Sequence, residues 1–451
     1  MIVNKIILPI CIALFFTACL VSGDEQESLC NFKNPEAVGE VLSGKRSVAN
    51  AAWWGFNSED STEAIQGAIN SRAQTVIIPY VGRDWVVRPI KLISNQEIFF
   101  EPGVVVTAKK GEFKGKYDCL FSAHHLSNVT LRGYGTTLRM QKADYMNSAK
   151  YTKSEHRHIV QIRSSENIKI LGFRLENSGG DGIFVGPKGG SITAVDEYFY
   201  VPCRNVAIKD CICDNNYRQG ISVISVNGLL VDNCILKNTR GTPPQAGIDL
   251  EPSNSKGILS NIVISNCVSD RNSGPGMTVN IDRLGAIPRE ISILFVNCYV
   301  KNCEKSALSV FAAENTNNIK GLIEFKNCVC ENINHRGINT IWEKVASPIT
   351  LRFSKCKFRN VAIRKNDVPF RLLLKTVHTA RQNGGIEIVD CYLYDEKKRP
   401  CLKITDRKGY NDIYDIKGDI YVYNPYGATV DSGITDKKMA LKIHSLKRTQ
   451  W

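Results

Sequence analysis

The sequence predicts an all-β fold, a single-stranded right-handed parallel β-helix of about nine coils with a short N-terminal capping helix. The first observation is a repeat, because self-similar segments at a fixed period indicate a solenoid. An alternating apolar and polar segment that ends in Cys recurs at intervals of 23 to 35 residues. Its copies end at Cys211, Cys234, Cys267, Cys298, Cys328, Cys356 and Cys391.

Each copy reads as a strand with one buried face, because successive side chains of a strand point to opposite sides. The residue before Cys is Asn, Asp or Lys in these copies, which suits a tight bend. Two earlier copies, 129–134 and 168–173, lack the Cys. The cysteines are therefore expected to form an interior ladder of free thiols, since Cys packs as a small hydrophobe. A disulfide among Cys203, Cys303 and Cys401, which lie outside the ladder, is left open.

The second observation is another short strand in each coil, which usually begins with Gly, as in 182–185, 220–223 and 247–250. The third is a polar turn, often with Asn, that precedes it. Three short strands and three turns per coil make a parallel β-helix. One coil cannot bury its apolar face alone, so the coils must stack.

The ends of the chain complete the predicted layout. Asp60 to Glu63 resembles a capping box, and the apolar stripe after it predicts a helix that covers the first coil. The expected domains are a signal peptide at 1–23, the β-helix at 45–430 and a C-terminal cap or tail at 431–451.

The N-terminus is typical of exported proteins. Lys5 precedes the apolar run Ile6 to Phe16, and Phe16-Thr-Ala-Cys19 resembles a bacterial lipobox. Cleavage near Gly23 is the alternative. We expect a cell-envelope lipoprotein or a secreted protein, attached to a membrane only through a lipid on Cys19, and a monomer.

The net charge is +14, which favours acidic partners such as uronate or sulfated polysaccharides. Charge that serves only solubility is the alternative. No nucleic-acid-binding motif is present, so a nucleic-acid partner is not expected.

The chain resembles the pectin-lyase-like superfamily over about residues 50 to 430. The matching pieces are the entry segment 60–68, the strand 76–79 that follows it and the Cys-terminated coils. The resemblance implies a right-handed parallel β-helix. It does not settle the activity, because that superfamily contains hydrolases, lyases, epimerases and noncatalytic phage or adhesin proteins.

Asp181 lies in Ser178-Gly-Gly-Asp-Gly-Ile183, which resembles the polygalacturonase strand whose Asp is catalytic. The resemblance stops there, because the next coils carry 218–220, 245–247 and 274–276 without that family's further motifs. A turn-capping role is the alternative for Asp181.

Asp249 and Glu251 form the sharpest candidate pair. At positions i and i+2 of a strand they share one face, with Cα atoms about 6.5–7 Å apart. Two neighbouring carboxyl groups can divide the roles of acid and base in glycosidic-bond cleavage. Thr278 and Asn280 of the next coil lie beside them. A cation site that adds Asp282, or a solvated strand face, remains open.

Other residues are expected to bind substrate. Arg218 suits a bidentate contact with a carboxylate, or the base of an arginine-type lyase, with a surface ion pair as the alternative. His158 and its neighbour Arg157 lie on the coil before Asp181. Asn280 accompanies the acidic pair, and Tyr198 lies in a long aromatic loop that suits sugar rings.

These residues favour a glycoside hydrolase that cleaves an acidic or substituted polysaccharide, with Asp249, Glu251 and Asp181 as catalytic residues. A polysaccharide lyase and a noncatalytic glycan-binding solenoid are the alternatives. No metal or other cofactor is expected, and calcium is the one cation left open.

Overall fold

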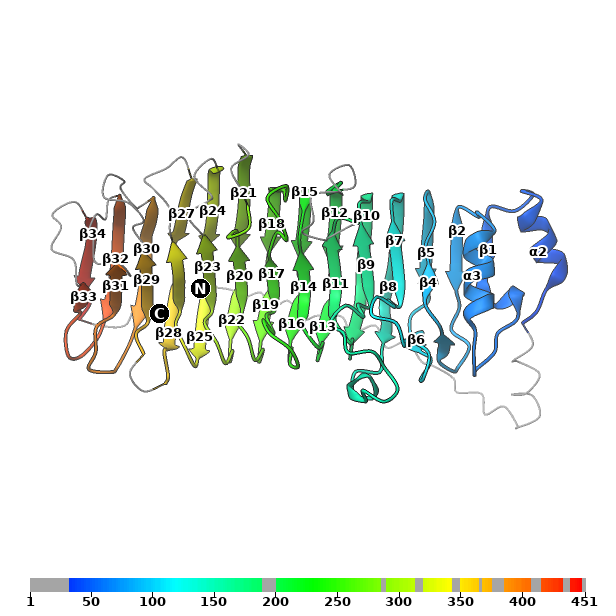
Figure 1. The fold of residues 1–451 in the computed structure, drawn as a ribbon, viewed down its shortest axis with the longest axis horizontal. Helices are drawn as coiled ribbons and strands as arrows, with labels where there is room; N and C mark the ends of the chain where they lie inside the picture. Colours follow the sequence, from blue (N-terminus) through cyan, green and yellow to red (C-terminus); the bar gives the residue numbers. More distant parts are fainter. Residues whose placement is uncertain are drawn as a thin grey trace, which may run out of the picture.

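The computed structural model describes residues 32–188, 200–284, 289–312, 319–342, 349–364, 367–374, 385–406, 415–432 and 439–447. It shows an elongated solenoid whose strands stack side by side from the N-terminal to the C-terminal end (Figure 1). Every strand pairing is parallel, and partners come from successive coils. The predicted all-β parallel β-helix is confirmed.

The strands of the described residues form a large sheet of 22 strands and a small sheet of twelve. The large sheet bends at a corner in each coil. Its strands are β1 (Val48–Asn50), β2 (Thr75–Ile78), β3 (Trp85–Val87), β5 (Gln96–Phe100), β6 (Val105–Ala108), β8 (Ser127–Arg139), β10 (Glu166–Glu176), β12 (Cys203–Lys209), β13 (Ile212–Asp214), β15 (Val226–Asp232), β16 (Ile235–Lys237), β18 (Leu259–Ser265), β19 (Val268–Asp270), β21 (Arg289–Val296), β22 (Tyr299–Lys301), β24 (Ile319–Lys326), β25 (Val329–Ile333), β27 (Ile349–Ser354), β28 (Lys357–Val361), β30 (Ile386–Tyr394), β32 (Ile416–Tyr423) and β34 (Ala440–Ser445).

The small sheet contributes one strand to each coil. Its strands are β4 (Ile90–Lys91), β7 (Phe121–His124), β9 (Val160–Arg163), β11 (Asp181–Gly186), β14 (Gln219–Val223), β17 (Ile248–Leu250), β20 (Met277–Asn280), β23 (Leu308–Ala312), β26 (Ile338–Trp342), β29 (Phe370–Leu374), β31 (Leu402–Asp406) and β33 (Val430–Ser432). The solenoid is therefore longer than the nine coils predicted, because the coils at both ends lack the Cys-terminated motif. Strands also continue past residue 430, where a cap or tail was expected.

The corners follow from the residues before the ladder cysteines. Asn233, Asn266, Asn297 and Asn327 all have φ between 52° and 56°, a left-handed conformation that Asn tolerates better than most residues. The Asn327 side-chain amide donates to Asn297 of the preceding coil at 2.7 Å. The predicted tight bend is confirmed, and its side chains add hydrogen bonds along the solenoid axis.

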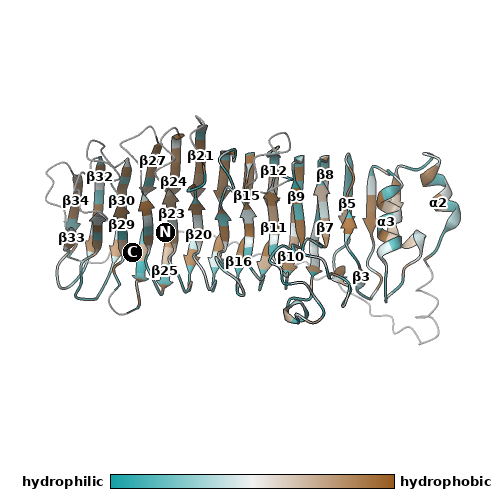
Figure 2. Ribbon diagram, viewed as in Figure 1, coloured by the Kyte–Doolittle hydropathy of each residue, from teal (hydrophilic) through white to brown (hydrophobic). Residues whose placement is uncertain are grey.

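The interior is apolar, with brown residues concentrated along the strands in Figure 2. The ladder cysteines are all buried free thiols, and several donate to a carbonyl of the preceding coil, as Cys298 does to Ile264 at 3.5 Å. Cys203, Cys303 and Cys401 are also free and buried, so the disulfide left open among them is absent. They too lie in the interior, where Cys serves as a small packing residue.

The N-terminal end is covered by helices, as Figure 1 shows. Helix α3 (Thr62–Asn70) buries Ala64, Ile65, Ala68 and Ile69 against the first coil, while α2 (Pro35–Leu42) and the 3₁₀ helix η1 (Ala51–Trp54) lie beside it. The capping helix is confirmed but its capping box is not. Ser61 is the N-cap and makes no capping bond, because its hydroxyl bonds to the backbone of Asn57. Asp60 accepts from the backbone of Thr62 and pairs with Arg88.

The ladder thiols should be unreactive while the protein is folded. Burial raises the pKa of the ladder thiol of Cys356 well above the usual range, and only the thiolate is nucleophilic. Treatment with a maleimide followed by peptide mapping should show no modification of the ladder cysteines in native protein and full modification in urea. Labelling of Cys267 or Cys298 in the native state would contradict the buried ladder.

Candidate active site

The candidate site lies on the outward side of the small sheet, near its middle. Ser222, Asp249, Thr278 and Ser309 are successive register partners on β14, β17, β20 and β23. Their neighbours Val223, Leu250 and Val279 belong to the hydrophobic core, and the four residues of the row are themselves only 0 to 4% exposed. Functional side chains on this row are held by a rigid sheet.

Asp249 lies at the centre of this row and is 2% exposed. The side-chain amide of Gln219 donates to its Oδ2 at 2.9 Å, and its Oδ1 has no hydrogen-bond partner among the described residues. Burial and the nearby charge of Glu251 raise the pKa of Asp249 to about 7. Asp249 therefore keeps its proton up to near-neutral pH.

Glu251 follows β17 directly and is more open, with a side chain 27% exposed. Its backbone amide donates to Val223 at 2.9 Å, which holds this residue in register with the preceding coil. The Asn280 side-chain amide donates to its Oε1 at 3.3 Å, and Arg218 lies 3.6 Å from its Oε2. Glu251 is thus held between a side-chain amide and a guanidinium group.

Arg218 connects the acidic residues of three coils. Its Nη1 lies 3.6 Å from Asp181 Oδ2 and its Nε lies 3.9 Å from Glu155 Oε2, in addition to the contact with Glu251. Its side chain is 13% exposed, and the surrounding carboxylates, Asp181 foremost, raise its pKa against the effect of burial. The structure thus brings Asp181, Asp249, Glu251 and Arg218 into one cluster.

His158 and Asp181 form the buried back of this cluster. The Asp181 backbone amide donates to His158 Nδ1 at 3.0 Å, and Asp181 Oδ2 lies 3.2 Å from the same nitrogen. Burial lowers the pKa of His158, so its imidazole is neutral at pH 7, and Nδ1 acts as an acceptor. The ring also stacks on Phe184 with centroids 4.8 Å apart. His158 is fully buried and positions Asp181.

Two predicted substrate contacts are not part of this cluster. Arg157 is fully buried just before β9, and its guanidinium donates to the carbonyls of Phe113, Lys114 and Thr152. These hydrogen bonds fix the long loop at 139–155 to the preceding coil. Tyr198 lies outside the described residues.

A pocket opens beside the cluster, with a volume of about 270 Å³. Glu155, the partner of Arg218, is part of its wall, and Tyr117 stacks on His156 with centroids 5.2 Å apart. Burial lowers the pKa of His156 to about 4. The pocket is lined by Lys116, Tyr117, Lys153, Ser154, Glu155, His156, Tyr217 and Thr242. Glu155, Gln219, Tyr117 and Tyr217 were not predicted as site residues. Glu155 and Gln219 adjoin residues 156–158 and Gly220 and Tyr217 precedes Arg218, but the sequence has no signal that marks Tyr117.

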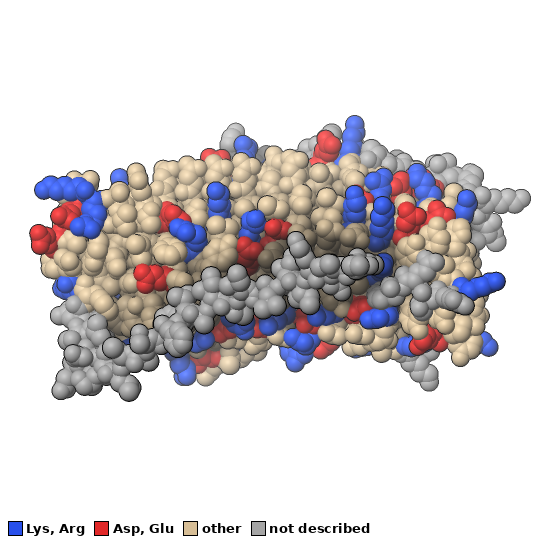
Figure 3. Space-filling view, turned by 180° about the vertical axis from the view of Figure 1, so that it is seen from behind, with Lys and Arg blue, Asp and Glu red and all other residues tan. Residues whose placement is uncertain are grey.

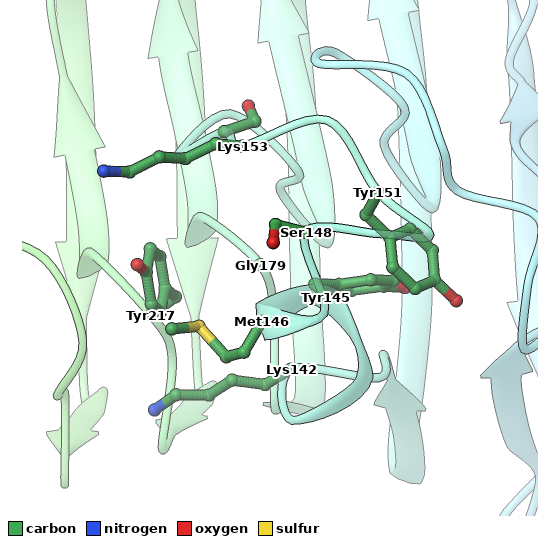
Figure 4. A pocket seen from close by; sticks show the side chains of 9 residues that line it. Lys142, Tyr145, Met146, Ser148, Tyr151, Lys153, Gly179 and Tyr217 are labelled. Atoms are coloured by element: carbon green, nitrogen blue, oxygen red, sulfur yellow. The ribbon is translucent and has the colours of Figure 1, made fainter.

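A smaller pocket of about 140 Å³ shares Lys153, Ser154 and Tyr217 with the first (Figure 4). Figure 4 shows the side chains of Lys142 and Lys153 reaching toward the side of the pocket where Tyr217 lies. Lys142 donates to Asn215 and, because of burial, has a pKa of about 8. Aromatic rings and lysines therefore flank the carboxylate cluster.

Charge elsewhere on the surface is mixed. Figure 3 shows Lys and Arg interspersed with Asp and Glu over the parts of one face that it describes. Among the described residues, no group of three or more His, Cys, Asp or Glu side chains is placed to hold a metal ion. No helix in the described part of the chain is long and apolar enough to cross a membrane.

Comparison with known proteins identifies the fold. A family model described as a right handed beta helix region matches residues 122–321. The fold is a right-handed parallel β-helix. The curated proteins contain no match to this sequence.

Solved structures similar to this right-handed β-helix include the A-module of a mannuronan C-5 epimerase from Azotobacter vinelandii. It has 14% identity and a TM-score of 0.60, and the match covers 89% of this chain and 100% of that chain. A hyperthermoactive exopolygalacturonase from Thermotoga maritima has 12% identity and a TM-score of 0.47, with coverage of 84% and 96%. A family 28 exopolygalacturonase from Yersinia enterocolitica has 12% identity and a TM-score of 0.49, with coverage of 90% and 77%.

The raised pKa of Asp249 predicts a stability effect in this right-handed β-helix. The folded state binds the Asp249 proton more tightly than the unfolded state, so the stabilisation is full at pH below about 4 and is lost as the pH rises through about 7. Asp249→Asn should therefore melt at a higher temperature than the wild type at pH 8, with a smaller difference at pH 4. The part-exposed Asp84→Asn is the control. A lower melting temperature for Asp249→Asn at pH 8 would contradict the assignment.

Proposed function

We propose that the chain is a polysaccharide-acting enzyme, specifically a glycoside hydrolase that cleaves an acidic or substituted glycan. One observation carries the proposal. Asp249, protonated up to about pH 7, and Glu251, ion-paired with Arg218, follow each other on one face of the small sheet. Two carboxyl groups in different protonation states are the working parts of a glycosidase. The described relatives support a polysaccharide substrate only through their shared fold.

In this proposal Asp249 is the general acid. Oδ2 is held by Gln219, so the proton resides on Oδ1 and passes to the leaving glycosidic oxygen as the bond breaks. Glu251 acts on the opposite side of the anomeric carbon, either by taking a proton from water or by direct attack. Arg218 and Asn280 hold Glu251 in place, and Asp181 with His158 fixes Arg218 from behind.

Substrate would reach the pair from the side of the pocket. Tyr117 and Tyr217 offer rings for sugar stacking, and Lys116 and Lys153 supply positive charge for acidic groups. The net charge of +14 favours an anionic polysaccharide in the same way. An arginine-type lyase is less favoured, because Arg218 is already engaged by three carboxylates.

The cellular setting is part of the proposal. The N-terminal segment supports export, with Cys19 as the proposed lipid-bearing residue of a monomeric envelope protein. Residues 1–31 lie outside the described part of the chain.

The activity is tested by incubating the protein with uronate-containing, sulfated and neutral polysaccharides and analysing the products by mass. A hydrolase yields new reducing ends and saturated fragments. Unsaturated fragments would indicate a lyase, and binding without any product would indicate a noncatalytic glycan-binding protein.

The pH profile adds a further prediction. Because Asp249 must carry its proton, kcat should fall as the pH rises through about 7. The measurement is kcat against pH on the best substrate of the panel, with thermal melting at each pH as the control for unfolding. A rate that keeps increasing between pH 7 and pH 9 would contradict Asp249 as the acid.

A further inference from the structure

A second cluster of charged side chains lies on the same small sheet, toward the C-terminal end. Asp249, Thr278, Ser309, Asn339 and Arg371 are successive register partners on β17, β20, β23, β26 and β29. Four strand steps of about 4.8 Å place Arg371 roughly 19 Å from Asp249 along the solenoid axis. The two clusters therefore share one continuous row of outward side chains.

The second cluster is built around the buried carboxylate of Asp367. Arg336 Nη2 lies 2.6 Å from Asp367 Oδ1, and His335 Nδ1 lies 3.4 Å from Oδ2. Arg371 Nε donates to Asn339 Oδ1 at 3.0 Å. Arg336 Nε and His335 Nε2 are buried and have no hydrogen-bond partner among the described residues. Buried donors without partners are costly, so these atoms mark a place where a ligand acceptor would fit.

Positive charge exceeds negative charge at this place. The charges that act on His335 come from Arg364, Asp367, Lys305 and Arg336, three cations against one anion. Burial, followed by Arg364, lowers the pKa of His335, so the ring is neutral at pH 7 and adds no charge of its own. The charge of Arg336 likewise lowers the pKa of Arg371, after burial. An anion placed here would relieve this repulsion.

Side-chain hydroxyl groups in the row between the two clusters also lack hydrogen-bond partners among the described residues. The hydroxyl oxygens of Thr278 and Ser309 are buried and make no hydrogen bond within the described residues. Thr278 and Ser309 are register partners on neighbouring strands, so they are one strand spacing apart along the axis. The row between the two clusters is therefore polar throughout, with Thr278, Ser309 and Asn339 between Asp249 and Arg371.

We propose that Arg336, Arg371 and His335 form an anion-binding subsite, distant from the catalytic pair, that takes a carboxylate or sulfate group of a bound glycan. This inference rests on the proposed function for its substrate, a polyanionic sugar chain long enough to extend over several coils. Arg371 would bind the anion through its guanidinium, while Asp367 holds Arg336 in place.

The test measures binding without turnover. In the Glu251→Gln background, calorimetric titration at low salt uses hexagalacturonate as the carboxylate probe, dextran sulfate as the sulfate probe and dextran as the neutral probe. At least one anionic probe should bind and dextran should not. Adding Arg371→Gln should weaken that binding about ten- to hundredfold, the factor supplied by one charge-assisted hydrogen bond. Arg371→Lys, which keeps the positive charge, should lose less affinity for that probe than Arg371→Gln does.

Arg271→Gln is the matched control, because Arg271 pairs with Asp270 outside the small sheet and its loss removes the same charge. It should change affinity less than about twofold. If Arg371→Gln does not fold, the exposed Arg364→Gln replaces it. The inference is overturned if neither anionic probe binds, if dextran binds equally well, or if the variants at 371 and 364 bind as the background does. If an anionic probe binds as expected but the wild-type protein hydrolyses no polysaccharide of the panel, the proposed function alone is refuted.

Discussion

Replacement of Glu251 by Gln is expected to lower kcat on the native glycan by about 10²- to 10⁴-fold, the range of a lost acid–base catalyst. Gln can still accept from Asn280, but it cannot act as a base or nucleophile and no longer pairs with Arg218. The fold should persist, because Glu251 is part-exposed and outside the core. Initial rates of reducing-end formation, with thermal melting as the folding check, measure the effect.

Glu304→Gln is the matched control for this substitution. Glu304 is exposed and pairs with Arg240 away from the carboxylate cluster, so its loss should leave kcat unchanged within about twofold. Full activity in Glu251→Gln would remove this residue from the mechanism. An equal loss in both variants would point to a general effect of charge.

The largest effect on stability is expected in the core, at Phe325. Its ring stacks between Phe295, with centroids 4.5 Å apart, and Phe353, with centroids 5.4 Å apart, and all three rings are fully buried. Phe325→Ala would leave a cavity between three coils and cost about 3–5 kcal/mol of unfolding free energy. Urea unfolding monitored by circular dichroism measures it.

Tyr426→Ala serves as the comparison, because Tyr426 is an exposed aromatic residue and its removal creates no cavity. It should change the unfolding free energy by less than about 0.5 kcal/mol. A Phe325→Ala variant as stable as Tyr426→Ala would mean that the aromatic stack contributes nothing to coil stacking.

The fold was predictable because each coil repeats the same pattern of alternating apolar and polar residues followed by a tight bend. The alternation of apolar and polar residues predicted that Val231 and Ile264 point inward, and the Asn, Asp or Lys before each ladder Cys marked a left-handed corner. The number of coils was underestimated, because β4 and β33 are only two and three residues long and carry no Cys or Asn signature. The predicted capping box was wrong for a different reason, because Asp60 pairs with Arg88, 28 residues away in the sequence.

The site was partly predictable. Positions i and i+2 placed Asp249 and Glu251 on one face, and alignment of the coils placed Arg218 between them and Asp181. The pattern of one strand does not show how deeply a side chain is buried, so the full burial of His158 beside Phe184 was not predicted. The partners of Arg157 were not predictable either. Its guanidinium binds the carbonyls of Phe113 and Lys114, which lie 44 and 43 residues before it, and that of Thr152, five residues before it.

The most direct test of the account is cleavage in water enriched in the heavy oxygen isotope, followed by mass analysis of the products. A hydrolase should give saturated fragments with one labelled oxygen on each new reducing end, and Glu251→Gln should not form these fragments. Unlabelled fragments with an unsaturated end would contradict it, because β-elimination adds no water and needs no carboxylate pair.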